Sequence, residues 1–170
     1  MTSASAAESK SDGKTKMEKA YFGAGCFWKV QYVFSKVPGV IKTRVGYSGG
    51  TTDNPTYKEV CSNSTGHAET VQVEYDPAKV SYQKLLTIFF ANHDPTTLNR
   101  QGPDHGTQYR SVIFCTSAQQ RKEALAYKEQ LTKEHKFKSP IVTVIQDATP
   151  FFDAEEYHQD YFIKHGASCD

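Results

Sequence analysis

The side chains with the greatest potential for chemistry in this 170-residue chain are its four cysteines, Cys26, Cys61, Cys115 and Cys169. They form no C-x-x-C pair and no histidine stands at ligand spacing, so a zinc site is not expected. Cys26 follows a glycine at the expected junction of a strand and a helix, where free amides and the helix dipole favour an anion. Such a site can lower the pKa of a thiol from about 8.5 towards neutrality. Cys26 is therefore either a reactive thiolate or a buried structural thiol.

Two large aromatic residues, Phe27 and Trp28, follow Cys26 directly, and Trp28 is the only tryptophan of the chain. Aromatic residues at the start of a helix commonly belong to a core. Beside an activated thiolate they would instead form a cage for a small apolar group. The junction therefore permits thiol chemistry on an apolar substrate, and it also permits a purely structural role.

The hydrophobic pattern predicts the elements that must position these side chains. Strands are expected at 19–24, 40–47, 69–75, 109–115 and 141–145, and helices at 27–36, 81–93 with Ser81 as its cap, 117–135 and 153–164. The polar stretches 51–67 and 94–108 are expected to be long loops, which are often functional. The order of elements predicts an α+β domain with a ferredoxin-like split β-α-β core, a mostly antiparallel sheet with helices packed on it, and C-terminal additions.

The composition predicts one ordinary globular domain. Residues 1–18 lack apolar periodicity and are expected to be a disordered tail, 19–164 a single catalytic domain, and 165–170 a flexible tail that carries Cys169. The formal net charge of +1 gives no attraction to nucleic acid or to an anionic membrane. No apolar run approaches the roughly 20 residues that span a bilayer, and no secretory or transit signal is recognised. We therefore expect a cytoplasmic protein, and a monomer by default.

Several motifs resemble those of A-type peptide methionine sulfoxide reductases. The run 25–28 reads Gly-Cys-Phe-Trp, and it is followed in order by matching runs at 54–57, 66–69, 93–95, 101–110 and 157–159. The resemblance extends from about Ala20 to the C-terminus. The chain departs from the family pattern at Gln31, where many members carry an acidic residue, and in its short tail, where Cys169 is the only cysteine.

The resemblance implies a role for each matched side chain. Cys26 is expected to attack the sulfoxide sulfur, and Glu69 to protonate the oxygen, which requires a dry setting that raises its pKa above about 4.3. The remaining roles fall to Tyr57 and Tyr109 as hydrogen-bond donors, Phe27 and Trp28 around the methyl group, and Asp104 as a polar contributor. Taken alone, Glu69 would be an exposed strand residue, each tyrosine a core-edge aromatic and Asp104 a loop cap.

The resemblance also implies how the enzyme is recycled. The reaction on the S epimer of the sulfoxide, free or protein-bound, would leave Cys26 as a sulfenic acid, which Cys169 condenses to a disulfide. Thioredoxin, or dithiothreitol in its place, would return the thiols, and no metal or organic cofactor is needed. Cys61, in the first long polar stretch, is the alternative resolving thiol, whereas Cys115 is expected in the core.

Two other functions remain open from the residues. A cysteine hydrolase or acyl transferase would pair Cys26 with His67, His105 or His158, with Asp104 orienting the base. A redox sensor would use Cys26 and Cys169 as a switch without turnover. His158 is otherwise expected to be structural.

Overall fold

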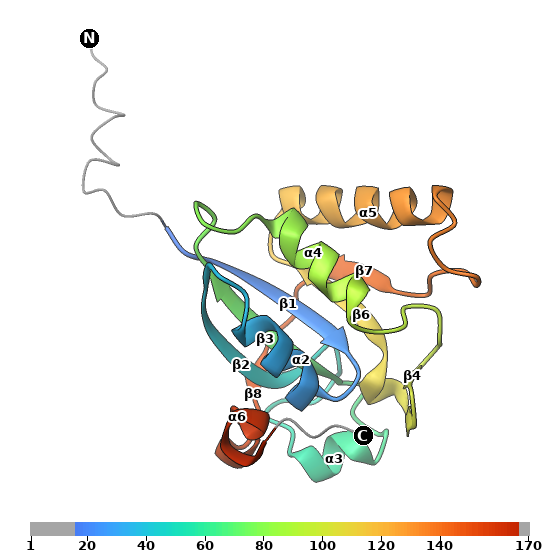
Figure 1. Ribbon diagram of the computed structural model, residues 1–170. Helices are drawn as coiled ribbons and strands as arrows, with labels where there is room; N and C mark the ends of the chain where they lie inside the picture. Colours follow the sequence, from blue (N-terminus) through green and yellow to red (C-terminus); the bar gives the residue numbers. More distant parts are fainter. Residues whose placement is uncertain (1–15, 167–170) are drawn as a thin grey trace.

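The computed structural model describes residues 16–166 (Figure 1). Its strands are β1 (Glu18–Ala24), β2 (Val40–Ser48), β3 (Ala68–Tyr75), β4 (Arg100–Gln101), β5 (Asp104–His105), β6 (Ser111–Cys115), β7 (Val144–Asp147) and β8 (Phe152–Asp153). Its helices are α2 (Phe27–Ser35), α3 (Tyr57–Cys61), α4 (Tyr82–Ala91), α5 (Ala118–Lys133) and α6 (Tyr161–His165), with 3-10 turns η1 (Thr107–Tyr109) and η2 (Glu156–His158). Most of the expected N-terminal tail, and the segment that carries Cys169, lie outside the described residues.

Six strands form one sheet in the order β7-β6-β1-β3-β2-β8, and β4 pairs with β5 in a separate hairpin. All neighbours in the large sheet are antiparallel except β6 and β7, which are parallel. The expected α+β class with a mostly antiparallel sheet is therefore confirmed, and the ferredoxin-like core stays a prediction. β1, whose end leads to Cys26, lies in the interior of the sheet between β3 and β6.

Helices α2 and α4 pack on the same face of the sheet (Figure 1). The ring of Phe22 on β1 stacks on Phe34 of α2 at 5.0 Å between centroids and on Phe89 of α4 at 5.2 Å. A single side chain points to one face only, so both helices must cover that face. A smaller apolar cluster, which includes Val112 and Phe114, occupies the other face. Both faces of the sheet are therefore covered by apolar side chains, and α2 packs against one of them.

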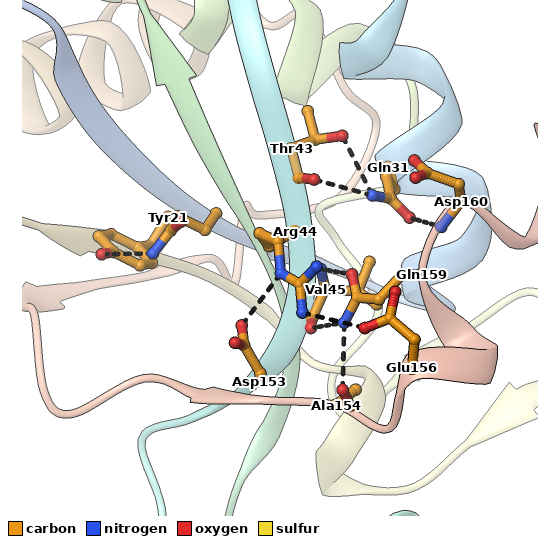
Figure 2. A network of polar contacts seen from close by, with 11 residues as sticks. Tyr21, Gln31, Thr43, Arg44, Val45, Asp153, Ala154, Glu156, Gln159 and Asp160 are labelled. Atoms are coloured by element: carbon orange, nitrogen blue, oxygen red, sulfur yellow. Dashed lines mark hydrogen bonds and ion pairs between the residues drawn. The ribbon is translucent and has the colours of Figure 1, made fainter.

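The expected helix over 153–164 is wrong. The segment forms β8, the turn η2 and the short helix α6 instead, and Asp160 between the last two has a positive φ of 56° that interrupts a helix. The Gln159 side chain explains the departure, because its amide accepts from Val45 N and donates to Val45 O and Ala154 O, each near 3 Å (Figure 2). Side-chain contacts to β2 replace the hydrogen bonds that a helix would make.

The two long polar stretches also contain elements that the pattern did not predict. α3 lies within 51–67, where Thr56 and Glu59 form a reciprocal capping box. The hairpin of β4 and β5 and the turn η1 lie within 94–108, with η1 running to Tyr109. Because η1 takes up Tyr109, β6 begins at Ser111 rather than at residue 109. β7 also differs from its expected bounds and spans 144–147 rather than 141–145. At the other end, β1 already begins at Glu18, which pairs with Tyr75.

Candidate active site

Cys26 is the N-cap residue of α2, and its side chain is partly buried. Gly25 makes the turn into the helix with a φ of +95°, and a Cβ there would lie 2.8 Å from the Gln101 side chain. The backbone N–H groups of Trp28 and Lys29 in the first turn lower the pKa of the Cys26 thiol, although the side chain makes no N-cap hydrogen bond. The first turn of α2 thus faces the thiol with two donors that favour a negative charge on sulfur.

The pKa of Cys26 is nevertheless raised, to about 12. Burial of the thiol is the largest cause and the Glu69 carboxylate is the next, and the two helix amides offset them only in part. The helix N-terminus lowers this pKa as expected, but the net pKa is raised because lost hydration outweighs the amides.

Glu69 lies near the start of β3 and its side chain is buried, with 1% of its surface exposed. Its Oε1 accepts a hydrogen bond of 3.1 Å from the Phe27 N–H, and its Oε2 has no partner within the described residues. Burial, supplemented by the charge of Asp104, raises the pKa of Glu69 to about 8. The carboxyl group therefore holds a proton near neutrality, and it is not an exposed strand residue.

Tyr57 and Tyr109 come together although they lie in different elements, α3 and η1. Their hydroxyl groups lie close enough for each to shift the pKa of the other, and the Cys61 thiol likewise shifts the pKa of Tyr57. Burial raises the pKa of both tyrosines, and the Glu69 charge adds to this, which places both near that carboxyl. Both hydroxyl groups keep their protons and can donate hydrogen bonds.

Trp28 forms an aromatic wall with residues from the C-terminal part of the chain. Its Nε1 donates to His158 Nδ1 at 3.0 Å, and its ring stacks on Tyr161 at 3.8 Å between centroids. Trp28, Cys26 and Asp104 line a pocket of about 560 Å³. Other predicted site residues lie outside its lining, namely Phe27, Tyr57, Glu69 and Tyr109.

Phe27 takes a place different from the one expected for it. Its side chain is 1% exposed and belongs to the core. Its ring packs against those of Tyr47 at 5.7 Å and Tyr57 at 6.5 Å. Phe27 therefore contributes through its backbone N–H to Glu69 and through packing behind Tyr57, while Trp28 alone of the pair lines the pocket.

Residues 18–169 match the family described as peptide methionine sulfoxide reductase. A relative from Methanoculleus marisnigri, peptide methionine sulfoxide reductase MsrA, is 60% identical over 150 residues, which cover 88% of this chain and 92% of the relative. The chain belongs to the peptide methionine sulfoxide reductase family. It is an A-type member, an oxidoreductase of a family that reduces methionine sulfoxide.

Solved structures share this architecture. The reduced form of Mxr1 from Saccharomyces cerevisiae superposes with a TM-score of 0.84 at 39% identity, covering 91% of this chain and 89% of that one. Mxr1 in complex with Trx2 gives a TM-score of 0.61 at 29% identity, over 86% and 85% of the two chains.

Among the described residues, none of the three histidines that a hydrolase would use in this peptide methionine sulfoxide reductase is paired with Cys26. His67 is buried, with Nδ1 accepting from Gly50 N and Nε2 bonded to the Thr52 carbonyl. His158 Nδ1 is occupied by Trp28, and His105 is exposed on the β5 hairpin. Within residues 16–166 none of these three histidines hydrogen-bonds to Cys26, so the hydrolase interpretation lacks its base.

Three residues of the site were not predicted from the sequence. Tyr47 fits the ordinary pattern of a strand and does not stand out from its neighbours. Tyr161 and Glu155 lay inside the helix that was wrongly predicted over 153–164, Glu155 at its acidic start. The structure brings Tyr161 onto Trp28, and Glu155 between Tyr47 and Tyr57. The sequence clue to Tyr161 and Glu155 was their position beside the matched motif at 157–159.

No group of three or more His, Cys, Asp or Glu side chains within residues 16–166 is arranged to hold a metal ion. No helix among these residues is long and apolar enough to cross a membrane.

Proposed function

We propose that this chain reduces the S epimer of methionine sulfoxide, free or within proteins, with Cys26 as nucleophile and Glu69 as general acid. The observation that carries the proposal is the Glu69 carboxyl group. The group is buried, its pKa is raised to about 8, and its Oε2 has no hydrogen-bond partner among the described residues. Its Oε1 accepts a hydrogen bond from Phe27, the residue next to Cys26. A group that holds a proton near neutrality and has no other partner for its second oxygen is suited to give that proton to a substrate.

The ionisation of the two groups is coupled through their charges. The Glu69 carboxylate is the second cause of the raised pKa of Cys26, so a proton on Glu69 removes that repulsion. The Trp28 and Lys29 amides then stabilise the thiolate. The reactive form therefore carries one proton for the pair, on Glu69 rather than on Cys26.

In the first step the Cys26 thiolate attacks the sulfoxide sulfur while Glu69 gives its proton to the oxygen. The oxygen passes to Cys26 as a sulfenic acid, the methionine sulfur gains two electrons, and Glu69 is left as a carboxylate that takes a proton from water. The hydroxyl groups of Tyr57 and Tyr109 would donate to the oxygen as charge grows on it. Trp28 would hold the methyl group, with Asp104 as a polar contributor on the pocket wall.

In the second step a resolving thiol attacks the sulfenic acid, which forms a disulfide and releases the oxygen as water. We assign this role to Cys169. The alternative is Cys61, whose pKa is raised by burial, and this disfavours the thiolate that must attack. The solved complex of the related Mxr1 with Trx2 supports a thioredoxin as the dithiol that reduces the disulfide and is itself oxidised.

The test incubates reduced enzyme with a racemic methionine sulfoxide peptide and dithiothreitol and measures methionine by chromatography. The wild type should stop when about half of the racemate is consumed, because one epimer fits. Cys26→Ser should make no methionine. Cys169→Ser should keep one turnover and lose turnover with thioredoxin, while the matched control Cys61→Ser keeps both. A wild type that makes no methionine but forms a disulfide with peroxide would establish the redox sensor instead.

A further inference from the structure

The carboxylate of Glu155, between β8 and η2, joins two elements that are distant in the sequence. Its Oε1 accepts a hydrogen bond of 2.9 Å from the Tyr47 hydroxyl of β2, and its Oε2 accepts one of 2.9 Å from the Tyr57 N–H of α3. These partners lie 108 and 98 residues away along the chain. Each carboxylate oxygen therefore accepts from its own donor.

The hydrogen bond from the Tyr57 N–H to Glu155 positions α3, a helix too short to be stable by itself. α3 has only five residues, and helices of this length depend on outside contacts for stability. The side chains of Thr56 and Glu59 satisfy each other's backbone N–H groups in the capping box, which leaves the Tyr57 N–H to Glu155. The orientation of Tyr57, the first residue of α3, is therefore tied to Glu155.

The hydrogen bond from the Tyr47 hydroxyl leads to the proposed general acid. Tyr47 of β2 is fully buried and stands directly opposite Glu69 of β3 in the antiparallel register. Paired residues point to the same face of a sheet, so both side chains lie on one side. The Tyr47 ring also contacts Phe27, whose N–H binds Glu69. Glu155 thus connects Tyr57 with the pair of strands that places Glu69.

Glu155 is charged, although no lysine or arginine within residues 16–166 forms an ion pair with it. Burial is the largest influence and opposes the charge, but the backbone N–H groups of Tyr57 and of Glu155 itself, the Tyr47 hydroxyl and His158 together outweigh it and lower the pKa of Glu155. The nearest basic group is His158, whose Nε2 lies 4.0 Å from Oε1. The two donors, rather than a cation, hold the carboxylate in position.

We infer that Glu155 is a positioning residue, which aligns the Tyr57 hydroxyl with Glu69 for transfer of charge and proton to the sulfoxide oxygen. This inference rests on the proposed function and names a residue to which the mechanism above gives no part. Glu155 does not line the pocket. It contacts Tyr57 directly, so we expect its effect to pass through Tyr57, and this can be tested.

The test is a double-mutant cycle of Glu155→Gln and Tyr57→Phe, measured as the single-turnover rate of methionine formation by reduced enzyme. Glutamine keeps the size but offers one acceptor oxygen instead of two. Glu155→Gln should slow the reaction about tenfold, which corresponds to one misplaced donor. The double variant should be no slower than Tyr57→Phe alone. The matched control, Glu156→Gln at an exposed neighbour, should stay within about twofold of wild type.

A structural defect would give another pattern. If Glu155→Gln merely loosens the fold, it slows both backgrounds by the same factor, and additive effects would overturn the inference. A Glu155→Gln rate equal to wild type would overturn it as well. If Glu155→Gln does not fold, Tyr47→Phe replaces it in the same cycle. Tyr47→Phe should then slow the reaction of the wild type but not that of Tyr57→Phe. Failure of the proposed function is separate, because the wild type itself would then make no methionine.

Discussion

The Phe27 N–H donates a 3.1 Å hydrogen bond to Glu69 Oε1 across 42 residues of sequence. This bond ties the first residue of α2, the immediate neighbour of Cys26, to the start of β3. It occupies one oxygen of the carboxyl group and leaves the other without a partner among the described residues. One hydrogen bond between the helix and the sheet therefore holds the nucleophile and the proposed acid in fixed relative positions.

Glu69→Gln should change both the rate and its pH dependence. The wild-type pair loses its first proton near pH 8, so the single-turnover rate should rise with pH and become level at about that value. Without the acid the rate should fall by about 10²–10⁴. It should also continue to rise above pH 8, because only the raised pKa of Cys26 then governs it. Single-turnover rates between pH 6 and 10 check this, and a variant that becomes level at the wild-type pH would contradict it.

The same substitution should stabilise the protein in alkaline solution. The pKa of Glu69 is raised from 4.5 to about 8 by folding, so the native state binds more protons between these values and loses stability as pH rises through them. Glu69→Gln removes this loss, with a gain on the order of 5 kcal/mol above pH 8 and little difference near pH 4. Urea unfolding at both pH values measures it. Glu74→Gln on the same strand is the control, and an equal gain there would refute the prediction.

Loss of the Thr56 cap should affect activity as well as stability. Thr56→Ala removes the acceptor for Glu59 N at the start of α3, and Ser81→Ala removes the acceptor for Lys84 N at the start of α4. Each should cost about 1 kcal/mol of unfolding free energy. Only Thr56→Ala should slow the sulfoxide step, because α3 carries Tyr57 and α4 carries no proposed site residue. Equal turnover in the two variants would show that α3 does not position the site.

Gln159→Glu should destabilise the fold strongly. The Gln159 amide donates to the carbonyls of Val45 and Ala154, and a carboxylate would face both oxygens without a proton (Figure 2). Gln159 is 2% exposed, so the cost should be roughly 3 kcal/mol or more. The exposed Gln83→Glu on α4 should change stability by less than about 0.5 kcal/mol. Thermal unfolding of both variants measures the difference, and similar melting temperatures would contradict the role of Gln159.

The sequence by itself determined the main elements and their order. Alternation of apolar residues marked β1, β2 and β3, and the spacing of 3.6 residues marked α2, α4 and α5, because each period reflects burial of one face. Ser81 was recognised as a cap because capping depends on neighbours only three residues away. The position of Cys26 at the start of a helix followed from the same local rules, and the ordered motifs identified the family.

Only the tertiary structure decided what surrounds these elements. The alternation of apolar residues could assign Glu69 to a strand. Whether its side chain is exposed to solvent or buried depends on α2 and the loops that cover it. The helix amides lower the pKa of Cys26 as the sequence predicted, but the net pKa is raised because dehydration by the rest of the fold outweighs them. The helix expected over 153–164 failed because Glu155 and Gln159 bond to groups about 100 residues away. Contacts between side chains and a distant backbone leave no period in a sequence, since they depend on where the folded chain returns.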